Sequence, residues 1–460
     1  MKYLMPVLLL SNLVLCQVSS AAGWVGFLTC AYLLYFSAVS ACGTLFSSAR
    51  LHLAMIICFM GTAVSVMTLV TFRSLDVDLS YEPENIRTIE GTVIYDSSFT
   101  KNGNHMMKIR LSRCVTETGD AGTASGIVAA VGKERSIISA GLGIRLEGEF
   151  REGLFIYEDL QVLERSVLND IREKLIVFLE ERVLGKECDD ASLMSCQLLL
   201  GRSENNSLEL QEKARQCGCA HVFALSGMHL SIFAGICMTL FGKGKFARVM
   251  SCLAVAAFLL TAGPRPSLIR AALSFYLFFI PLKDRTVAVY CIHMILFPAT
   301  MCELGSCYGY LAVFAIVWMA PYLKAVLFQY IGRLSSLVSA SLSVLVVSAP
   351  VYIICNGFWN PASVIAAPAA GFLAACSMSL GLLTLSFGRT DFLLKSNSFV
   401  YRCMDRLFDI LMGIPTAGWV GYAVLVGVLL LLYAFNRHRH RHWKKISSDH
   451  ATSTEPHNPL

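Results

Sequence analysis

Two histidines and a serine interrupt an apolar segment near the middle of the chain, and their side chains are able to do chemistry. The segment runs from His221 to Phe241 and includes Ser226, Gly227 and His229. About twenty apolar residues at a rise of 1.5 Å each cross a hydrocarbon layer of roughly 30 Å, so the segment predicts one membrane helix. Polar side chains in such a helix usually face a protein interior or a water-filled path, because exposing them to lipid is costly.

The spacing of these residues limits what they can do together. On a helix, His221 and His229 lie about 80° apart around the axis and about 12 Å apart along it, too far to share one metal ion. Ser226 and His229 can be neighbours on one face. Three interpretations stay open: the histidines bond to neighbouring helices, they line an aqueous path, or Ser226 and His229 form a nucleophile and base pair. No acid able to orient the base lies nearby in the sequence.

A second polar motif follows a break between two apolar segments. The prolines on either side of Arg265 break the helix after Gly263, and Ser267 is placed to cap the helix that follows. The first turn of that helix contains Arg270. An arginine near the end of a membrane helix snorkels to the headgroups, pairs with an acid or binds an anion, and all three roles stay open here.

The composition predicts a polytopic α-helical membrane protein. Of the 460 residues 55% are hydrophobic and 15% are charged, whereas soluble domains have about 25% charged residues. We expect about ten or eleven transmembrane helices. Apart from the N-terminal segment, the candidate spans are 24–41, 51–72, 221–241, 246–262, 267–281, 286–302, 309–323, 334–355, 362–387 and 415–435. Lysine and arginine in every second loop predict a cytoplasmic N terminus and place His221 at the outer end of its helix.

A small β domain is inserted after the first spans. From about residue 82 to 164, apolar and polar residues alternate in short segments at 89–95, 106–111, 144–150 and 154–157, separated by glycine-rich turns. This pattern predicts an extracytoplasmic OB-like barrel. Nucleic-acid contact and a structural or partner-docking role are both open for its basic and aromatic residues, which are Tyr95, Phe99, Lys101, His105, Lys108, Arg110 and Arg113. Amphipathic segments from 166 to 219 predict helices on or in the membrane interface.

Most of the 17 cysteines lie within apolar spans, where a thiol packs as a small hydrophobe. Cys217, Cys219, Cys302 and Cys307 fall near span ends, so a disulfide there is an open alternative. No cysteine or histidine spacing predicts a metal site, and we expect no metal or cofactor.

The motifs resemble those of ComEC-type competence membrane channels. The resemblance rests on Leu198-Leu199-Leu200-Gly201, His221-x-x-Ala224-Leu225-Ser226-Gly227-Met228-His229 and Gly263-x-x-x-Ser267-x-x-Arg270-Ala271-Ala272. It covers about 190–390, and the preceding order of helices and OB-like domain is also similar. The resemblance implies transport of one DNA strand across the inner (cytoplasmic) membrane during natural transformation. The residues expected along the DNA path are His221, Ser226, Gly227, His229, Gly263, Arg265, Ser267 and Arg270.

The residue patterns and this resemblance together divide the chain into six regions. They are N-terminal transmembrane helices (1–75), the extracytoplasmic OB-like domain (76–165), amphipathic interfacial helices (166–220), the competence-type channel core (221–390), C-terminal membrane segments (391–436) and a basic polar tail (437–460). The side of the membrane on which the tail lies stays open.

The sequence departs from the family at two places. Many members have a Phe-Gln-Leu-Ser-Phe-like helix where this chain has Cys307-Tyr308-Gly309-Tyr310-Leu311. Many also end in a metallo-β-lactamase-like domain, and no His-x-His-x-Asp-His cluster occurs here. We therefore expect a channel rather than an enzyme, working in membrane lipid with single-stranded DNA and with a separate DNA receptor, nuclease and cytoplasmic motor. No phosphate-binding loop of the Gly-x-x-x-x-Gly-Lys type is present in the sequence.

Two other function classes stay open. A transporter of a small anion or metabolite would use His229 and Arg270 as its substrate site, and it predicts tight binding of a small ligand and normal DNA uptake in its absence. An intramembrane Ser/His hydrolase would use Ser226 as nucleophile. It predicts covalent labelling by a serine-directed probe that Ser226→Ala abolishes.

The channel hypothesis makes a direct genetic prediction. Arg270→Ala or His229→Ala should abolish DNA uptake while leaving DNA binding at the cell surface and membrane insertion unchanged, because only the path through the membrane loses its polar groups. Transformation frequency in a deletion strain complemented with each variant measures this. Normal uptake in both variants refutes the assignment.

Overall fold

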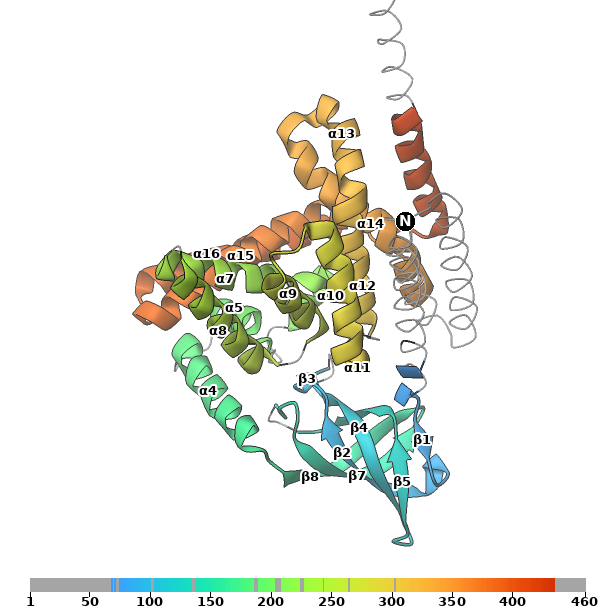
Figure 1. The fold of residues 1–460 in the computed structure, drawn as a ribbon. Helices are drawn as coiled ribbons and strands as arrows, with labels where there is room; N and C mark the ends of the chain where they lie inside the picture. The colour runs from blue at the N-terminus through green and yellow to red at the C-terminus, as the bar shows by residue number, and fades with distance from the viewer. Residues whose placement is uncertain are drawn as a thin grey trace, which may run out of the picture. The chain divides into compact units, whose positions relative to one another are not determined.

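The computed structural model describes residues 68, 70–71, 74–100, 103–134, 137–185, 189–202, 208–223, 227–242, 244–263, 265–301 and 303–434. These residues form a β-barrel followed by helices (Figure 1). They fall into two compact units, of which one comprises the residues up to Tyr310 with Ala366–Gly413, and the other Leu311–Ile365 with the residues from Ile414 onward. The predicted helices before residue 68 and the basic tail lie outside the described residues.

Five strands close the barrel. They are β2 (Ile86–Val93), β4 (His105–Thr116), β6 (Ile127–Gly132), β7 (Gly143–Arg151) and β8 (Leu154–Glu164). The ring runs β2, β4, β6, β8, β7 and back to β2, with only the β6–β8 pair parallel among these five strands. Short elements extend it, namely β1 (Asp78–Leu79), β3 (Ser98–Phe99), β5 (Ala121–Ser125) and the turn η1 (Pro83–Asn85).

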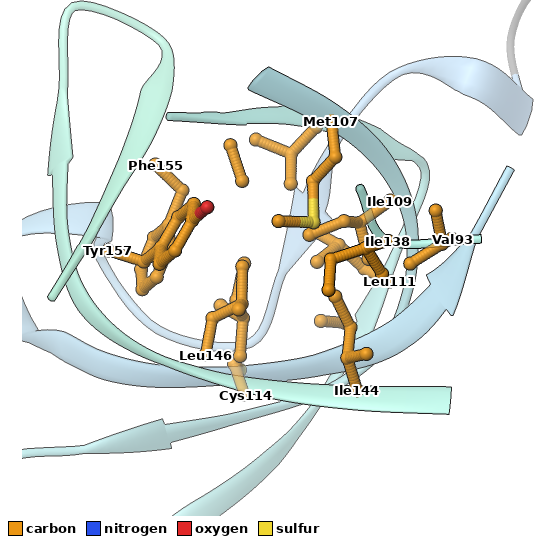
Figure 2. Packing of buried hydrophobic residues seen from close by; sticks show 14 of the residues in the cluster. Val93, Met107, Ile109, Leu111, Cys114, Ile138, Ile144, Leu146, Phe155 and Tyr157 are labelled. Atoms are coloured by element: carbon orange, nitrogen blue, oxygen red, sulfur yellow. The ribbon is translucent and has the colours of Figure 1, made fainter. Parts of the chain in front are cut away.

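Alternation in the sequence accounts for most of the barrel. Along β4, Met107, Ile109 and Leu111 are buried and the residues between them are exposed, and Figure 2 shows these three side chains packed with Phe155 and Tyr157. The four predicted strand segments fall within or overlap β2, β4, β7 and β8. Strand β6 was not predicted, because its sequence is apolar on both faces and lacks the alternation.

One residue for which nucleic-acid contact and a structural role were both open belongs to the barrel interior. His105 is fully buried, and its Nδ1 lies 2.7 Å from the Tyr157 hydroxyl. The Tyr157 ring fits only because residue 132 is glycine, since a Cβ there would lie 2.5 Å from the ring. Lys108 points outward and pairs with Glu303 at 3.6 Å, and Lys101 lies outside the described residues. The structural role is therefore correct for His105.

The helices follow in sequence. They are α4 (Val167–Leu184), α5 (Asp190–Leu200), α6 (Leu208–Gln216), η3 (Ala220–Val222), α7 (Gly227–Phe241), α8 (Lys245–Ala262), α9 (Pro266–Tyr276), α10 (Leu282–Leu296), α11 (Pro298–Met301), α12 (Leu304–Phe314), the π-helical turn η4 (Ala315–Met319), α13 (Ala320–Ile331), η5 (Gly332–Leu334), α14 (Ser335–Asn356), α15 (Ser363–Phe387) and α16 (Asp391–Leu411). A further apolar helix spans Trp419–Ala434.

Four helical runs among the described residues are long and apolar enough to cross a membrane. They are Ala220–Thr239, whose residues 224–226 lie outside the description, Lys245–Ala262, Leu304–Asn356 and Ser363–Phe387. The predicted spans 267–281 and 286–302 differ from the structure. Helices α9 and α10 have 11 and 15 residues, or about 16 and 22 Å at 1.5 Å per residue, too short to span a bilayer alone.

Helix α5 is enclosed by other helices of the protein. Every residue from Ala191 to Leu200 is buried, because α5 packs between α4, α8 and α16. A closed polar ring joins it to α15 and α16: Ser195 Oγ lies 2.9 Å from Ser377 Oγ, Ser377 donates to Asn397 Oδ1 at 2.9 Å, and Asn397 Nδ2 donates to Ser195 Oγ at 2.8 Å. Each buried polar group in the ring thus has a partner. The interfacial assignment of the rest of 166–220 stays a prediction.

A buried carboxylate joins the barrel to the helices. Asp96, just after β2, accepts two hydrogen bonds from the Arg172 guanidinium of α4, at 2.8 and 2.7 Å. Both side chains are almost fully buried, with 3% and 6% exposed. Arg172 also donates to the carbonyls of Leu260 and Thr261 at the end of α8. Burial alone would raise the pKa of Asp96, but the Arg172 hydrogen bonds outweigh burial and the pKa lies below its usual value.

We predict that Asp96→Asn lowers the stability of the protein by about 3–5 kcal/mol, because it leaves a buried guanidinium without its counter-charge. Because the pKa of Asp96 is lower in the native state, the carboxylate stabilises the native state fully above the unfolded-state pKa of about 4. This stabilisation is lost progressively as the pH falls through the native pKa. The difference in stability between wild type and variant should therefore shrink at acid pH. Thermal unfolding of the full-length protein in detergent micelles measures both effects.

The exposed pair of Arg87 and Glu117 supplies the control. Its side chains are 52% and 68% exposed, so Glu117→Gln should change stability by less than about 1 kcal/mol. Equal effects of the two substitutions would contradict the buried-pair interpretation.

Candidate functional site

The structure separates the two histidines of the first motif. His221 is exposed in the 3-10 turn η3, whereas His229 is fully buried in α7. The segment begins with η3 and continues as α7 within the helical run Ala220–Thr239, in agreement with the predicted span, and residues 224–226 between them lie outside the description. Ser226 lies outside the described residues, so its pairing with His229 stays a prediction. Gly227, which begins α7, is half-buried.

The two motif helices pack directly on each other. A Cβ placed on Gly227 of α7 would lie 3.3 Å from the Cβ of Ala271 on α9, and Ala271 follows Arg270 in the chain. On another side of α7, Met228 Sδ lies 3.8 Å from a Cβ placed on Gly371 of α15. Small residues permit such close approach of helices. The structure therefore brings the first and second motifs together.

The turn before α9 contacts a side chain of α4. Gly263 has φ of 80°, and a Cβ there would lie 3.0 Å from Arg172 Nη2. Pro266 occupies the first helical position and Arg265 is the N-cap. Ser267 is consequently not the cap predicted from the sequence, because proline, with its fixed φ and missing N–H, takes the N1 position ahead of it. Ser267 itself is half-buried.

Arg265 makes a structural contact with the third motif. Its Nη2 donates to the carbonyl of Gly201 at 2.5 Å. Gly201 ends α5 in the left-handed conformation, so its carbonyl needs a donor that the helix does not supply. Arg265 thus joins the end of α5 to the start of α9. This contact uses one of the hydrogen-bond donors of its guanidinium.

Arg270 is in a different situation. Its guanidinium carbon lies 5.7 Å from the centre of the Tyr310 ring, a cation–π distance. Nη1 is buried and has no hydrogen-bond partner among the described residues. No carboxylate in the described part of the chain forms an ion pair with Arg270. The guanidinium also packs against Gly309, where a Cβ would lie 2.2 Å from Nη1.

A buried hydrogen-bond chain holds the ring that Arg270 faces. His293 of α10 is fully buried. Its Nδ1 lies 3.1 Å from the Tyr310 hydroxyl and its Nε2 3.0 Å from Thr300 Oγ1. Tyr290 packs edge-on against the Tyr310 ring, with ring centres 5.0 Å apart. The position of the Tyr310 ring is therefore determined from several sides.

Sequence reasoning missed three residues of this site: His293, Gly309 and Tyr310. The segment that contains Gly309 and Tyr310 was noted only as a departure from the family pattern. The sequence could have indicated His293, because an ionisable residue within a predicted membrane span is a candidate functional residue. Nothing in the sequence indicated that Gly309 lies against Arg270, 39 residues earlier in the chain.

The site is suited to binding an anion. It offers a buried, delocalised cation with unused donor capacity, an aromatic face behind it and a neutral hydrogen-bond chain. Among the described residues, no group of three or more histidine, cysteine, aspartate or glutamate side chains could hold a metal ion. Cys217, Cys219 and Cys307 are free thiols, and Cys302 lies outside the description. Burial raises the pKa of Cys219 to about 12.

We predict opposite behaviour for two glycines of α12. Gly309→Ala should destabilise the protein by about 1–3 kcal/mol, because the new methyl group overlaps the Arg270 guanidinium. Gly305→Ala is the matched control, since nothing lies within 4 Å of its Cβ position, and it should be neutral or slightly stabilising. Thermal unfolding of the two variants in detergent compares them. Equal stability would contradict the contact at Gly309.

Comparison with known proteins agrees with the motifs. The model of the family described as Competence protein matches residues 198–440, more than half of the 460 residues. The matched region begins at Leu198, the first residue of the Leu-Leu-Leu-Gly motif, and includes α7, α9 and the Arg270 site. No curated protein and no solved structure matches the chain. With its motifs placed on packed helices and the family model covering them, this chain belongs to the competence protein family, of the ComEC type.

Proposed function

We propose that this protein conducts single-stranded DNA across the cytoplasmic membrane, and that Arg270 contacts the phosphates of the moving strand. The observation that carries the proposal is the buried Nη1 of Arg270, which has no hydrogen-bond partner among the described residues. A buried charge without an opposite charge is costly. A phosphate group supplies both the missing charge and the missing acceptors.

Three other arginines of this unit argue for the same site by contrast. Arg172 pairs with Asp96, and Arg202 lies 3.8 Å from the same carboxylate and donates to Ser139 at 2.9 Å. Arg265 donates to the Gly201 carbonyl. Each of these three cations has an oxygen partner in the protein, although Nε of Arg202, like Nη1 of Arg270, has no hydrogen-bond partner among the described residues. Arg270 is the one whose stabilisation is left to an aromatic face, so it is the natural place for a transient anion.

A single weak contact suits conduction better than a cluster of cations. A conduit must bind its substrate strongly enough to admit it and weakly enough to release it. Several free arginines would hold a polyanion in place, because each contact adds to the affinity through counterion release. His229, which is buried in α7, the helix that packs on α9, adds polarity without a permanent charge at neutral pH.

We infer that the barrel is OB-like and that it guides the strand outside the membrane. Five strands closed in this order, with one parallel pair, support an OB-like fold. Arg110 and Arg113 are exposed on the outer face of β4, and OB-like barrels bind single strands through basic faces. Described aromatic side chains such as Tyr157 face inward, so base stacking on this barrel is not part of the proposal.

The proposed partners follow from the same role. The protein lies in the inner membrane, contacts lipid through its apolar helices and receives DNA from a separate receptor. A separate nuclease removes the second strand, and a cytoplasmic motor supplies the energy. The protein itself acts as a channel and not as an enzyme. The hydrolase alternative depends on Ser226, which lies outside the described residues.

A small-anion transporter is the second candidate. One guanidinium with an unused donor also fits inorganic phosphate or a carboxylate, so the Arg270 geometry is compatible with both ligands. Relative affinity distinguishes them. If inorganic phosphate binds the purified protein more tightly than an oligonucleotide does, the transporter is favoured.

We predict that Arg270→Ala weakens binding of a fluorescent oligothymidine to the full-length protein in nanodiscs. Loss of one phosphate contact should also reduce the slope of log affinity against log salt by about 0.7. Arg270→Lys, which keeps the charge, should retain most of the slope. The control is Arg333→Ala, at an exposed arginine between α13 and α14. If Arg270→Ala binds the oligonucleotide with wild-type affinity and wild-type salt dependence, the proposal is wrong.

A further inference from the structure

The side chain of Arg270 is held without help from any acid in the described residues, so something else must determine where its charge lies. Its neighbours are the face of Tyr310 and the backbone of Gly309. Both belong to α12, whereas Arg270 belongs to α9. An arginine side chain has several rotatable bonds and loses much conformational entropy when it is fixed. The α12 contacts must therefore supply the restraint.

A chain of hydrogen bonds lies behind Tyr310. Thr300 donates its hydroxyl proton to the Phe297 carbonyl at 2.9 Å, and its oxygen lies 3.0 Å from His293 Nε2. The Tyr310 hydroxyl lies 3.1 Å from His293 Nδ1 and 3.5 Å from the Val289 carbonyl. The phenol ring is therefore anchored at its far end.

The ring and the glycine act on the guanidinium in different ways. The aromatic face attracts the cation through its quadrupole. Glycine at 309 lets the guanidinium lie against the helix backbone, in space that any Cβ would occupy. Tyr290 stops the Tyr310 ring from turning away. In this arrangement the buried Nη1 has no hydrogen-bond partner among the described residues, and the carbon of the guanidinium lies over the Tyr310 ring.

We propose that Tyr310 is a positioning residue for DNA binding, which presents the Arg270 guanidinium to a phosphodiester through its ring while His293 anchors its hydroxyl. This inference rests on the proposed function and deepens it. It assigns to the Gly309-Tyr310 pair of α12 the task of holding the arginine. The ring is the essential part, and the hydroxyl only orients it.

Two substitutions separate the ring from the hydroxyl. Tyr310→Phe keeps the aromatic face and should bind a fluorescent oligothymidine within about twofold of wild type. Tyr310→Leu keeps an apolar side chain but removes the face. It should weaken binding by about three- to thirtyfold, the range expected for a cation–π contact, and reduce the salt slope as Arg270→Ala does. Tyr330→Leu, at a tyrosine 51% exposed on α13, is the control and should change neither quantity.

A double-mutant cycle tests whether Tyr310 acts through Arg270. In the Arg270→Ala background, Tyr310→Leu should have no further effect on affinity, because the group that it positions is absent. An equal loss in both backgrounds, or a loss with an unchanged salt slope, overturns the inference and assigns Tyr310 a purely structural role. Thermal unfolding identifies a variant that fails to fold. If Tyr310→Leu does not fold, Tyr310→Phe tests the inference by itself, because it removes only the hydroxyl. Loss of oligothymidine binding in Tyr310→Phe would contradict the claim that the ring is the essential part.

The two proposals fail in distinguishable ways. If Arg270→Ala leaves affinity and salt slope unchanged, the proposed DNA contact is wrong whatever Tyr310 does. If Arg270→Ala removes one phosphate contact and Tyr310→Leu does not, the DNA contact stands and only the positioning role is wrong.

Discussion

The buried ion pair between Asp96 and Arg172 is the interaction on which the rest of this unit depends. It ties the end of β2 to α4, and the same guanidinium donates to the last carbonyls of α8. Its Nη2 also occupies the space above Gly263, where the chain turns into α9. The start of the helix that carries Arg270 is therefore defined by a contact that begins in the barrel. Separating the two residues would leave a buried charge without an opposite charge, which is costly. Arrangements in which β2 and α4 are only partly docked are therefore disfavoured.

The arginines of this unit illustrate two uses of one side chain. Arg172, Arg202 and Arg265 satisfy carboxylate or carbonyl oxygens and hold elements together. Arg270 has an aromatic ring and a glycine as neighbours. Arginines with an oxygen partner contribute to stability, whereas we propose that the spare donors of Arg270 serve ligand binding. The difference lies in the surroundings, since the four residues have the same chemistry.

Small side chains make the approach of the helices possible. Gly227 lies against Ala271, and Gly309 lies against Arg270. Helices in an apolar medium associate through close packing and polar contacts rather than through the hydrophobic effect. The ring of Ser195, Ser377 and Asn397 provides the polar part in the same unit, since each hydroxyl and amide in it is matched. Packing and polar satisfaction thus work together around the buried α5.

The sequence by itself determined the features that depend on local periodicity and composition. Alternation predicted β2, β4, β7 and β8, long apolar runs predicted α7, α8, α14 and α15, and the three motifs identified the family. Tertiary structure decided the features that depend on residues far apart in the chain. It enclosed α5, placed Pro266 ahead of Ser267 as the first residue of α9, put His105 inside the barrel and set Gly309 and Tyr310 against Arg270. The physical reason is that periodicity reports which face of an element is apolar, whereas the partner of a buried polar group is chosen by the packing of elements that the chain brings together only when it folds.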